Sequence, residues 1–306
     1  MKSKSIILIG GPDSGKTNYL ARLWPSFRRN KGELRADKTP TDISYVDSAV
    51  EHLMMGEFAP RSDRNLEVGR ADFSIDVRAN FGNGEPCSLM IPDISGELWN
   101  KAVATSEISA EWLDILQESE GAVLFVRHAS DQTVQPLDWV TARSALNLLS
   151  DDNSSIENDT DGEPDNRAEP PIDSQEQSIP TQVLLCELLR YLSTFLAGRA
   201  DGSAPKVSVV IAAWDMVGPE LKAEGPRKYL EREFPLFAGR LACESRLSIK
   251  IFGTSIVGGD LNDDPEFKAT YFDRDITEHG YIVVQESDRV QTVDDITLPI
   301  AWAIGT

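Results

Sequence analysis

One stretch near the start of the chain, residues 6–17, most constrains how the sequence can fold. It opens with four apolar residues, Ile6 to Ile9, which is typical of a buried strand. The residues that follow, 10–17, fit the pattern G-x-x-x-x-G-K-[ST] without a mismatch. Apolar residues then recur at helical spacing, namely Tyr19, Leu20, Leu23 and Trp24. A strand, a glycine-rich loop and a helix in this order predict a phosphate-binding loop.

The predicted loop has the chemistry to bind a polyphosphate. Its backbone N–H groups and the unpaired donors of the first helical turn can face an anion, which the helix dipole also favours. Lys16 can reach the β- and γ-phosphates, where it also serves catalysis, and the Thr17 hydroxyl can ligate Mg²⁺. The predicted ligand is therefore a nucleotide with Mg²⁺. The residues expected to contact its phosphates are Gly11, Asp13, Ser14, Gly15, Lys16, Thr17 and Asn18.

Composition excludes several classes of partner. The chain of 306 residues has a formal net charge of −20, which argues against a nucleic-acid partner and against an anionic membrane surface. No apolar run reaches the roughly 18 residues that a membrane span needs, and the run at Ile6 is too short for a secretion signal. Cys87, Cys186 and Cys243 lie far apart and form no metal-type pair. These features predict a cytoplasmic protein.

Hydrophobic periodicity predicts an α/β fold. Helical spacing covers residues 16–29, 44–58, 104–119, 181–199, 226–243 and 296–304, and Pro235 can interrupt the helix at 226–243. Strand patterns cover residues 6–9, 70–79, 88–91, 121–126, 206–213, 247–252 and 280–284. The second and third of these strands flank a turn and should pair as an antiparallel hairpin. We therefore expect a single domain over residues 1–306, with a doubly wound, mostly parallel sheet and one antiparallel edge strand.

An acidic segment, residues 151–179, interrupts this pattern. From residue 151 to residue 180 the chain has ten Asp or Glu, one basic residue and hardly any apolar side chains. Such a segment cannot offset its ordering entropy by burying surface. We predict a disordered insertion within the domain, which is either a solvated loop or a partner-binding segment.

A second polar motif follows the predicted strand 88–91. Asp93 and Gly96 form the pattern D-x-x-G at the carboxyl end of that strand, where open α/β sheets bind ligands. The Asp93 carboxylate can hold Mg²⁺ directly or through water, and the Gly96 N–H can approach a γ-phosphate closely. The position of this motif, about 75 residues after the phosphate loop, supports a role in the same site.

The order and spacing of these motifs resemble the GTPase branch of the P-loop NTPases. Residues 214–215, Trp-Asp, fall where that family carries N-K-x-D, and residues 254–256 fall where it carries T-S-A. The Trp-Asp variant, the helix at 44–58 and the apolar, Trp-containing end look like the double-GTPase group of bacterial conflict gene clusters. The resemblance implies a P-loop NTPase fold and a GTP-binding molecular switch.

The base motif departs from the family pattern. Ala212 and Ala213 replace its Asn and Lys, so the amide tether to the phosphate loop and the aliphatic cover over guanine are missing. Asp215 remains, and its carboxylate can accept from guanine N1–H and N2–H. Ile256 would offer only its backbone N–H to guanine O6. The predicted base-binding residues are Trp214, Asp215, Ser255 and Ile256.

The resemblance also suggests residues for the metal and the attacking water. Ser62 is the candidate metal cap of the first switch, and Thr39 and Thr41 compete with it. Glu97 stands where many relatives have a Gln or His that orients the water, so Gly96, Glu97 and Lys16 are the predicted catalytic residues.

The sequence therefore predicts a protein that binds GTP and Mg²⁺, hydrolyses GTP slowly and is recognised by a protein partner at its switch regions. Two alternatives stay open at this point. The weakened base motif also permits an ATP-hydrolysing P-loop enzyme. The second alternative is an assembly module that binds a nucleotide but does not hydrolyse it.

Overall fold

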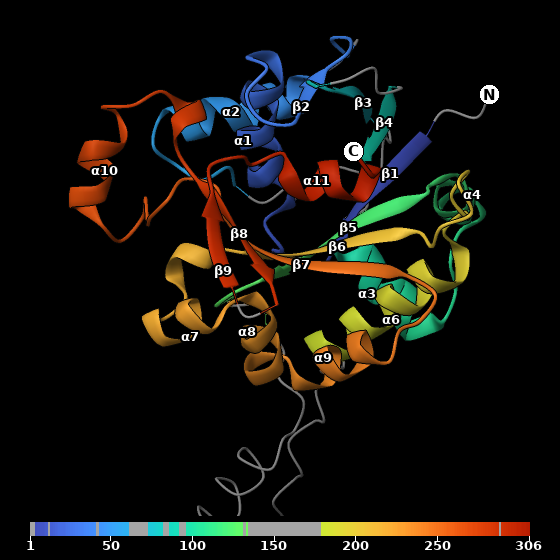
Figure 1. Ribbon diagram of the computed structural model, residues 1–306. Helices are drawn as coiled ribbons and strands as arrows, with labels where there is room; N and C mark the ends of the chain where they lie inside the picture. Colours follow the sequence, from blue (N-terminus) through green and yellow to red (C-terminus); the bar gives the residue numbers. More distant parts are fainter. Residues whose placement is uncertain are drawn as a thin grey trace, which may run out of the picture.

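A single β-sheet runs through the molecule, with helices on both of its faces (Figure 1). The computed structural model describes residues 4–11, 13–40, 43–60, 73–81, 86–91, 96–130, 133, 179–287 and 289–306. In these residues the sheet has nine strands in the order β2-β3-β4-β1-β5-β6-β7-β8-β9. The strands are β1 (Lys4–Gly10), β2 (Leu34–Ala36), β3 (Phe73–Ala79), β4 (Cys87–Ile91), β5 (Gly121–Arg127), β6 (Lys206–Ala212), β7 (Ser248–Ser255), β8 (Tyr281–Glu286) and β9 (Arg289–Val293).

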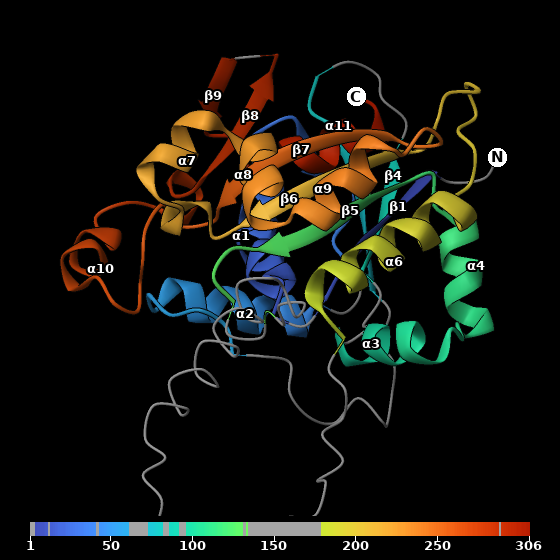
Figure 2. The ribbon, with the colours of Figure 1, turned by 90° about the horizontal axis from the view of Figure 1, so that it is seen from below.

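The helices divide between the two faces of the sheet (Figures 1 and 2). Helices α1 (Lys16–Arg28), α2 (Ser44–Met54) and α11 (Leu298–Ile304) lie on one side. On the other side lie α3 (Gly96–Thr105), α4 (Ala110–Glu118), α6 (Thr181–Phe195), α8 (Pro226–Glu233) and α9 (Pro235–Ala242). The remaining helical elements are α7 (Pro219–Glu224), α10 (Pro265–Tyr271) and the 3-10 turns η2 (Trp214–Met216) and η3 (Ile276–Glu278).

Alternation along β1 explains why both faces are covered. Ile6 and Leu8 pack in the cluster formed with α1 and α11, whereas Ile7 and Ile9 pack in the cluster formed with α3, α4 and α6. All four side chains are at most 2% exposed. A strand buried on both faces needs an uninterrupted apolar run, because successive side chains point to opposite faces. The doubly wound α/β architecture predicted from the sequence is confirmed.

The ends of the sheet contain more antiparallel pairing than the sequence predicted. Strands β4, β1, β5, β6 and β7 are parallel, and the expected hairpin of β3 with β4 is present, with Asp76 opposite Ser88. However, β3 is not an edge strand, because β2 pairs outside it, and β8 and β9 extend the other end. The prediction of one antiparallel edge strand is therefore corrected. Both outermost strands are short, and β9 is largely exposed, so neither produces a strong apolar pattern.

The predicted helix at 104–119 is wrong in its extent. Two helices stand in its place: α3 ends at Thr105 and α4 begins at Ala110. Ser106 between them has a left-handed φ of 58°, and the Ser109 hydroxyl caps α4 by accepting from Trp112 N. A residue in the left-handed region ends a helix, and an N-cap serine starts the next one. The predicted helix at 226–243 is interrupted at Pro235: α8 ends at Glu233, and α9 begins at Pro235. The remaining predicted helices agree with the structure to within about four residues at their ends.

Residues 151–178, the bulk of the predicted acidic insertion, lie outside the described residues. The single domain over 1–306 stays a prediction in the same way. Within the described chain, no helix combines the length and the apolar character that crossing a membrane requires.

Helix α6 offers a test of the core that supports the parallel strands. Leu188 is fully buried, while Val183 on the same helix is 36% exposed. Leu188→Ala should lower the free energy of unfolding by about 3 kcal/mol, because it leaves a cavity. Val183→Ala, the control, should change it by less than about 0.5 kcal/mol. Denaturant titration of both variants measures the difference, and equal losses would contradict this placement of α6.

Candidate functional site

The predicted phosphate-binding and base-binding segments meet at one edge of the sheet. Strands β1, β5, β6 and β7 are parallel neighbours, so their carboxyl ends lie side by side. In the sheet register Gly10 pairs with Phe125, and Arg127 pairs with Ala212. Ala212 pairs in turn with Thr254. Ligands of open α/β sheets bind at this edge, so the fold brings the two predicted halves of the site together.

The phosphate loop has the strand–loop–helix geometry that its motif requires. Strand β1 ends at Gly10, and α1 begins at Lys16. The Lys16 ammonium donates to Gly10 O at 2.7 Å, to Gly11 O at 3.2 Å and to Ser14 Oγ at 3.1 Å. A cation therefore lies across the loop beside the N-terminus of α1. Both features favour a phosphate group at this point, and Thr17 follows in the first turn of the helix.

The end of β6 packs directly against the phosphate loop. Gly15, the residue before α1, has a left-handed φ of 87°, which a glycine adopts without strain. A Cβ placed on Gly15 would lie 3.2 Å from the Cβ of Ala212. Ala212 has only a methyl group, so it contacts the loop by packing and donates no side-chain hydrogen bond to it. The strand that carries the base motif thus touches the loop without the amide tether of the family pattern.

The last residue of β5 and a residue just after the strand bind the phosphate loop from the other side. The Arg127 guanidinium pairs with the Asp13 carboxylate at 2.5 Å and also donates to Asp13 O at 3.4 Å. The Ser130 hydroxyl donates to the second carboxylate oxygen of Asp13 at 2.8 Å. Asp13 itself has a left-handed φ of 52°. This carboxylate therefore holds the loop to the exit of β5.

Sequence reasoning missed Arg127 and Ser130 as site residues. One signal was available, because Arg127 is the first polar residue after the buried run 121–126 and stands at the carboxyl end of a strand. His128 follows it, donates its backbone N–H to Ala212 O and pairs its ring with the Tyr229 hydroxyl at 2.8 Å. Residues 127–130 thus contact both the phosphate loop and the base-motif strand.

Asn18 connects α1 to the segment that precedes the predicted first switch. Its side-chain oxygen accepts from Ala59 N at 2.8 Å. Asn18 was predicted to contact phosphate, and the observed bond leaves its backbone N–H at the helix N-terminus for that role. The side chain therefore anchors the chain just before residue 61.

Asp215 lies on the base side of the edge, in η2 directly after β6. Burial raises the pKa of its carboxyl, and a hydrogen bond with the Ser255 side chain opposes that rise. The Lys222 ammonium donates to Asp215 O at 2.7 Å and so fixes the backbone of η2. A partly desolvated carboxylate is a strong acceptor for a base that presents two adjacent N–H donors.

Trp214 does not occupy the position expected for a base contact. Its side chain is 1% exposed and packs edge-on against Tyr229, with ring centroids 5.5 Å apart. A Cβ on Gly253 would lie only 2.5 Å from the indole ring. The ring therefore fills the core beneath η2. The prediction that the Trp214 side chain binds the base is corrected, and Trp214 instead supports the turn that carries Asp215.

Ser255 and Ile256, which we call the base loop, close the site beside Asp215. Ser255 is the last residue of β7 and is fully buried. Its hydroxyl oxygen accepts from Gly258 N at 2.8 Å, which turns the chain after the strand. The backbone of the base loop is thereby placed next to η2, as the predicted role of its N–H groups requires.

Several predicted site residues fall outside the described part of the chain. Asp93, Ser62 and Thr41 are among them. Gly96 is the first residue of α3, and Glu97 lies in its first turn with a side chain outside the described set. Their roles stay predictions, as does that of the exposed Thr39. Among the described side chains, no group of three or more His, Cys, Asp or Glu could hold a metal ion.

Comparison with known proteins gives a match over nearly the whole chain. The family model described as Double-GTPase 1 matches residues 7–303. Two solved structures are similar at low identity. One is Roco2 RocCORdC of Methanosarcina barkeri bound to GDP, with 12% identity, a TM-score of 0.31, and coverage of 95% of this chain and 52% of that chain. The other is the signal recognition particle receptor SRb-GTP/SRX complex of Chaetomium thermophilum. It has 13% identity, a TM-score of 0.36, and coverage of 89% of this chain and 96% of that chain.

The chain thus spans about half the length of the Roco2 chain. Among curated proteins, no sequence matches this one.

The pairing of Arg127 with Asp13 can be measured by a double-mutant cycle. Arg127→Met, Asp13→Asn and the double variant should give a coupling free energy of about 1 kcal/mol in denaturant unfolding, since the two side chains are only 37% and 16% exposed. The matched control is the more exposed pair Arg232–Glu224, whose coupling should be below about 0.5 kcal/mol. If the losses of unfolding free energy in the two single variants simply add in the double variant, the contact between Arg127 and Asp13 is contradicted.

Proposed function

Because this chain belongs to the Double-GTPase 1 family, we propose that it binds GTP with Mg²⁺, hydrolyses it slowly and signals its nucleotide state to a protein partner. The observation that carries the proposal is the direct contact of two half-sites. The phosphate loop at Gly15 packs on Ala212, three residues before the Asp215 carboxylate. A phosphate site and a base acceptor so placed fit the two ends of one nucleotide.

Phosphate binding would rest on the loop and on Lys16. The loop N–H groups and the N-terminus of α1 supply fixed partial positive charge, and the Lys16 ammonium adds a full one. In the structure this ammonium is bonded to Gly10 O, Gly11 O and Ser14 Oγ, so it is already held over the loop. This position supports the proposal that Gly11 and residues 13–18 contact the phosphates.

Thr17, Asp93 and Ser62 are the residues we propose to hold Mg²⁺. Thr17 is placed by the first turn of α1, next to the cation-bearing loop, and a hydroxyl oxygen is a ligand that Mg²⁺ accepts. Bound Mg²⁺ would neutralise charge on the β- and γ-phosphates. Asp93 and Ser62 enter the proposal from their sequence positions alone.

Hydrolysis would be an in-line attack of water on the γ-phosphorus. The bond from that phosphorus to the β–γ bridging oxygen breaks, and GDP and inorganic phosphate leave. Lys16 stabilises the charge on the departing oxygen, and the Gly96 N–H and Glu97 stand at the start of α3 to position the γ-phosphate and the water. Since an ionised Glu97 is repelled by the γ-phosphate, we expect a rate below about 0.01 per second without an activator.

Guanine is the base that Asp215 favours. Adenine would face this half-buried carboxylate with an acceptor at N1, which can donate no hydrogen bond to it. The rival function, ATP hydrolysis, is favoured by one observation, the loss of Asn and Lys at positions 212 and 213. Loss of the γ-phosphate contacts would release the segments near Ser62 and Gly96, and a partner in a bacterial conflict system would read that change.

Lys16 tests the phosphate site. Lys16→Ala should weaken GTP binding by at least about a hundredfold, because it removes the one cationic side chain of residues 10–17. Lys228→Ala on the exposed side of α8 is the control and should bind normally. Calorimetry with GTP and Mg²⁺ measures both, and an unchanged affinity in Lys16→Ala would rule out this phosphate site. Thr17→Asn should lose only the Mg²⁺-dependent part and favour GDP.

Asp215 tests the base. Asp215→Asn exchanges an acceptor for a mixed donor and acceptor, so GTP should bind about a hundredfold more weakly and xanthosine triphosphate more tightly. Competition among GTP, ATP and xanthosine triphosphate measures the change. Asp201→Asn, in the exposed turn before β6, is the control. If the wild type binds ATP as well as GTP and Asp215→Asn changes neither, the protein is a P-loop ATPase.

A further inference from the structure

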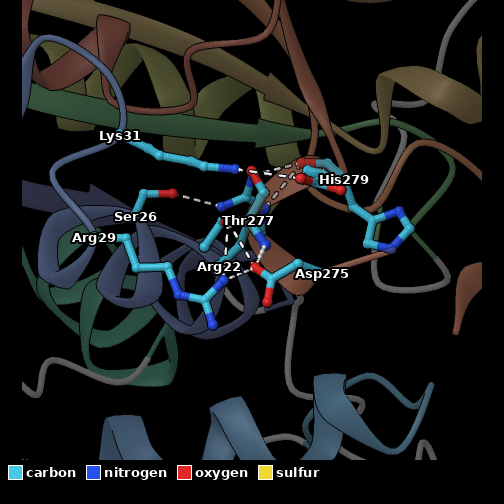
Figure 3. Close-up of polar contacts among 8 residues, drawn as sticks. Arg22, Ser26, Arg29, Lys31, Asp275, Thr277 and His279 are labelled. Atoms are coloured by element: carbon cyan, nitrogen blue, oxygen red, sulfur yellow. Dashed lines mark hydrogen bonds and ion pairs between the residues drawn. The ribbon is translucent and has the colours of Figure 1, made fainter. Parts of the chain in front are cut away.

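We propose that residues 275–280, which we call the strap, position the base loop and fix it to helix α1. The inference rests on the proposed function and adds positioning residues to it, chiefly Arg22 and Gly280. The strap comprises Asp275, the turn η3, His279 and Gly280, and it leads directly into β8. It contacts both the helix that begins at the phosphate loop and the loop expected to bind the base, and Figure 3 shows the contacts with the helix.

Arg22 anchors the strap to α1. Its side chain is 1% exposed, and its guanidinium donates to His279 O at 2.9 and 2.6 Å and to Thr277 O at 3.0 Å. A further N–H donates to the Ser26 hydroxyl at 2.6 Å (Figure 3). Burial lowers the pKa of Arg22 to about 10, so the group is still charged at neutral pH. A buried charge that binds backbone carbonyls fixes the path of those carbonyls.

Surface pairs extend this attachment to the residues just after α1. The Arg29 guanidinium pairs with the Asp275 carboxylate, and the Lys31 ammonium lies 3.7 Å from Glu278 (Figure 3). Asp275 also accepts from Thr277 N and Thr277 Oγ1, at 2.9 and 2.6 Å, and so caps η3. The strap is therefore held to α1 by both buried and exposed contacts.

The His279 side chain fixes the strap from the side away from Arg22. Its Nε2 lies 2.8 Å from Tyr271 O, and its ring stacks on the Tyr271 ring with centroids 4.2 Å apart. Helix α10, which ends at Tyr271, is thereby joined to the strap. Backbone and side chain of the same residue are thus held by two different helices.

Gly280 transmits this position to the base loop. A Cβ on Gly280 would lie 2.5 Å from Ile256 O and 2.6 Å from Ser255 O, both of them backbone atoms. The residue also has a φ of 77°, and the next residue, Tyr281, pairs with Ser255 in the sheet. The backbone of the strap is therefore in close contact with the backbone of the base loop. Any displacement of the strap displaces the N–H groups that would face guanine.

The decisive variant is Gly280→Ala, and the chain offers a matched control. Gly202 has the same φ of 77°, but a Cβ there would meet nothing within 4 Å. Alanine imposes the same backbone penalty at both positions, and only Gly280→Ala pushes on the base loop. The measurement is displacement of a fluorescent guanosine diphosphate by GDP and by inorganic tripolyphosphate, with Mg²⁺, because tripolyphosphate uses the phosphate loop alone.

Gly280→Ala should weaken GDP binding at least tenfold and leave tripolyphosphate binding within about twofold of wild type. Gly202→Ala should change neither. Equal behaviour of the two alanine variants, or an equal loss for both ligands in Gly280→Ala, would overturn the proposal. If the wild type binds GDP no more tightly than tripolyphosphate, the base recognition in the proposed function fails first, and the strap has no base loop to position.

Arg22→Met tests the anchor at α1 against a second buried arginine. Arg199 also donates to backbone carbonyls, those of Ala303 and Ile304, and its side chain is 7% exposed, but it lies at the opposite end of β6 from Asp215. Both variants should lose stability. Only Arg22→Met should also reduce the ratio of GDP affinity to tripolyphosphate affinity, and an unchanged ratio would overturn its role. If Arg22→Met does not fold, the comparison of Gly280→Ala with Gly202→Ala still tests the proposal.

Discussion

The parallel pairing of β1 with β5, and of β5 with β6, determines where the rest of the site lies. Because these strands run in the same direction, the phosphate loop after β1, Arg127 at the end of β5 and the base motif after β6 all lie at one edge. Side chains buried on both faces hold that register. A slip of one residue would exchange the faces on which Ile6 and Ile7 are buried and disrupt both clusters. The chemistry of the site thus depends on a hydrophobic core that itself contacts no ligand.

The structure also explains how the site can tolerate the alanines at 212 and 213. In the family pattern an amide joins the base motif to the phosphate loop, and here Ala212 contacts the loop only through its methyl group. Hydrogen bonds from Arg127 and Ser130 to Asp13 hold the loop instead, at the neighbouring strand. On the base side, Lys222 fixes the backbone of Asp215, and Trp214 fills the core under the turn. Several elements therefore share the role that the Asn side chain has in the family pattern.

How much could be predicted from the sequence depended on how local the signal was. The run Ile6 to Ile9, the motif after it and the helical spacing of α6 are local, and each was predicted with nearly correct bounds. Arg22 was not recognised, because its partners Thr277 and His279 lie more than 250 residues away, and a buried arginine resembles a surface one in sequence. Arg127 and Asp13 are separated by 114 residues in the same way. Trp214 was assigned to the base because it falls within the family's base motif, and sequence does not show which way the ring points.

Helix α11 has a consequence for how the protein acquires its structure during synthesis. It packs on β1, β5 and β6, where Ser208 donates to Pro299 O at 2.6 Å and Ala301 and Ala303 are fully buried. One face of the central strands is therefore completed by residues 298–304, which the ribosome makes long after β1. Until then the apolar side chains on that face have no native cover, so a nascent chain would hold a phosphate loop on an unfinished sheet. The native form of the sheet, and of the phosphate loop that it carries, therefore depends on synthesis reaching α11.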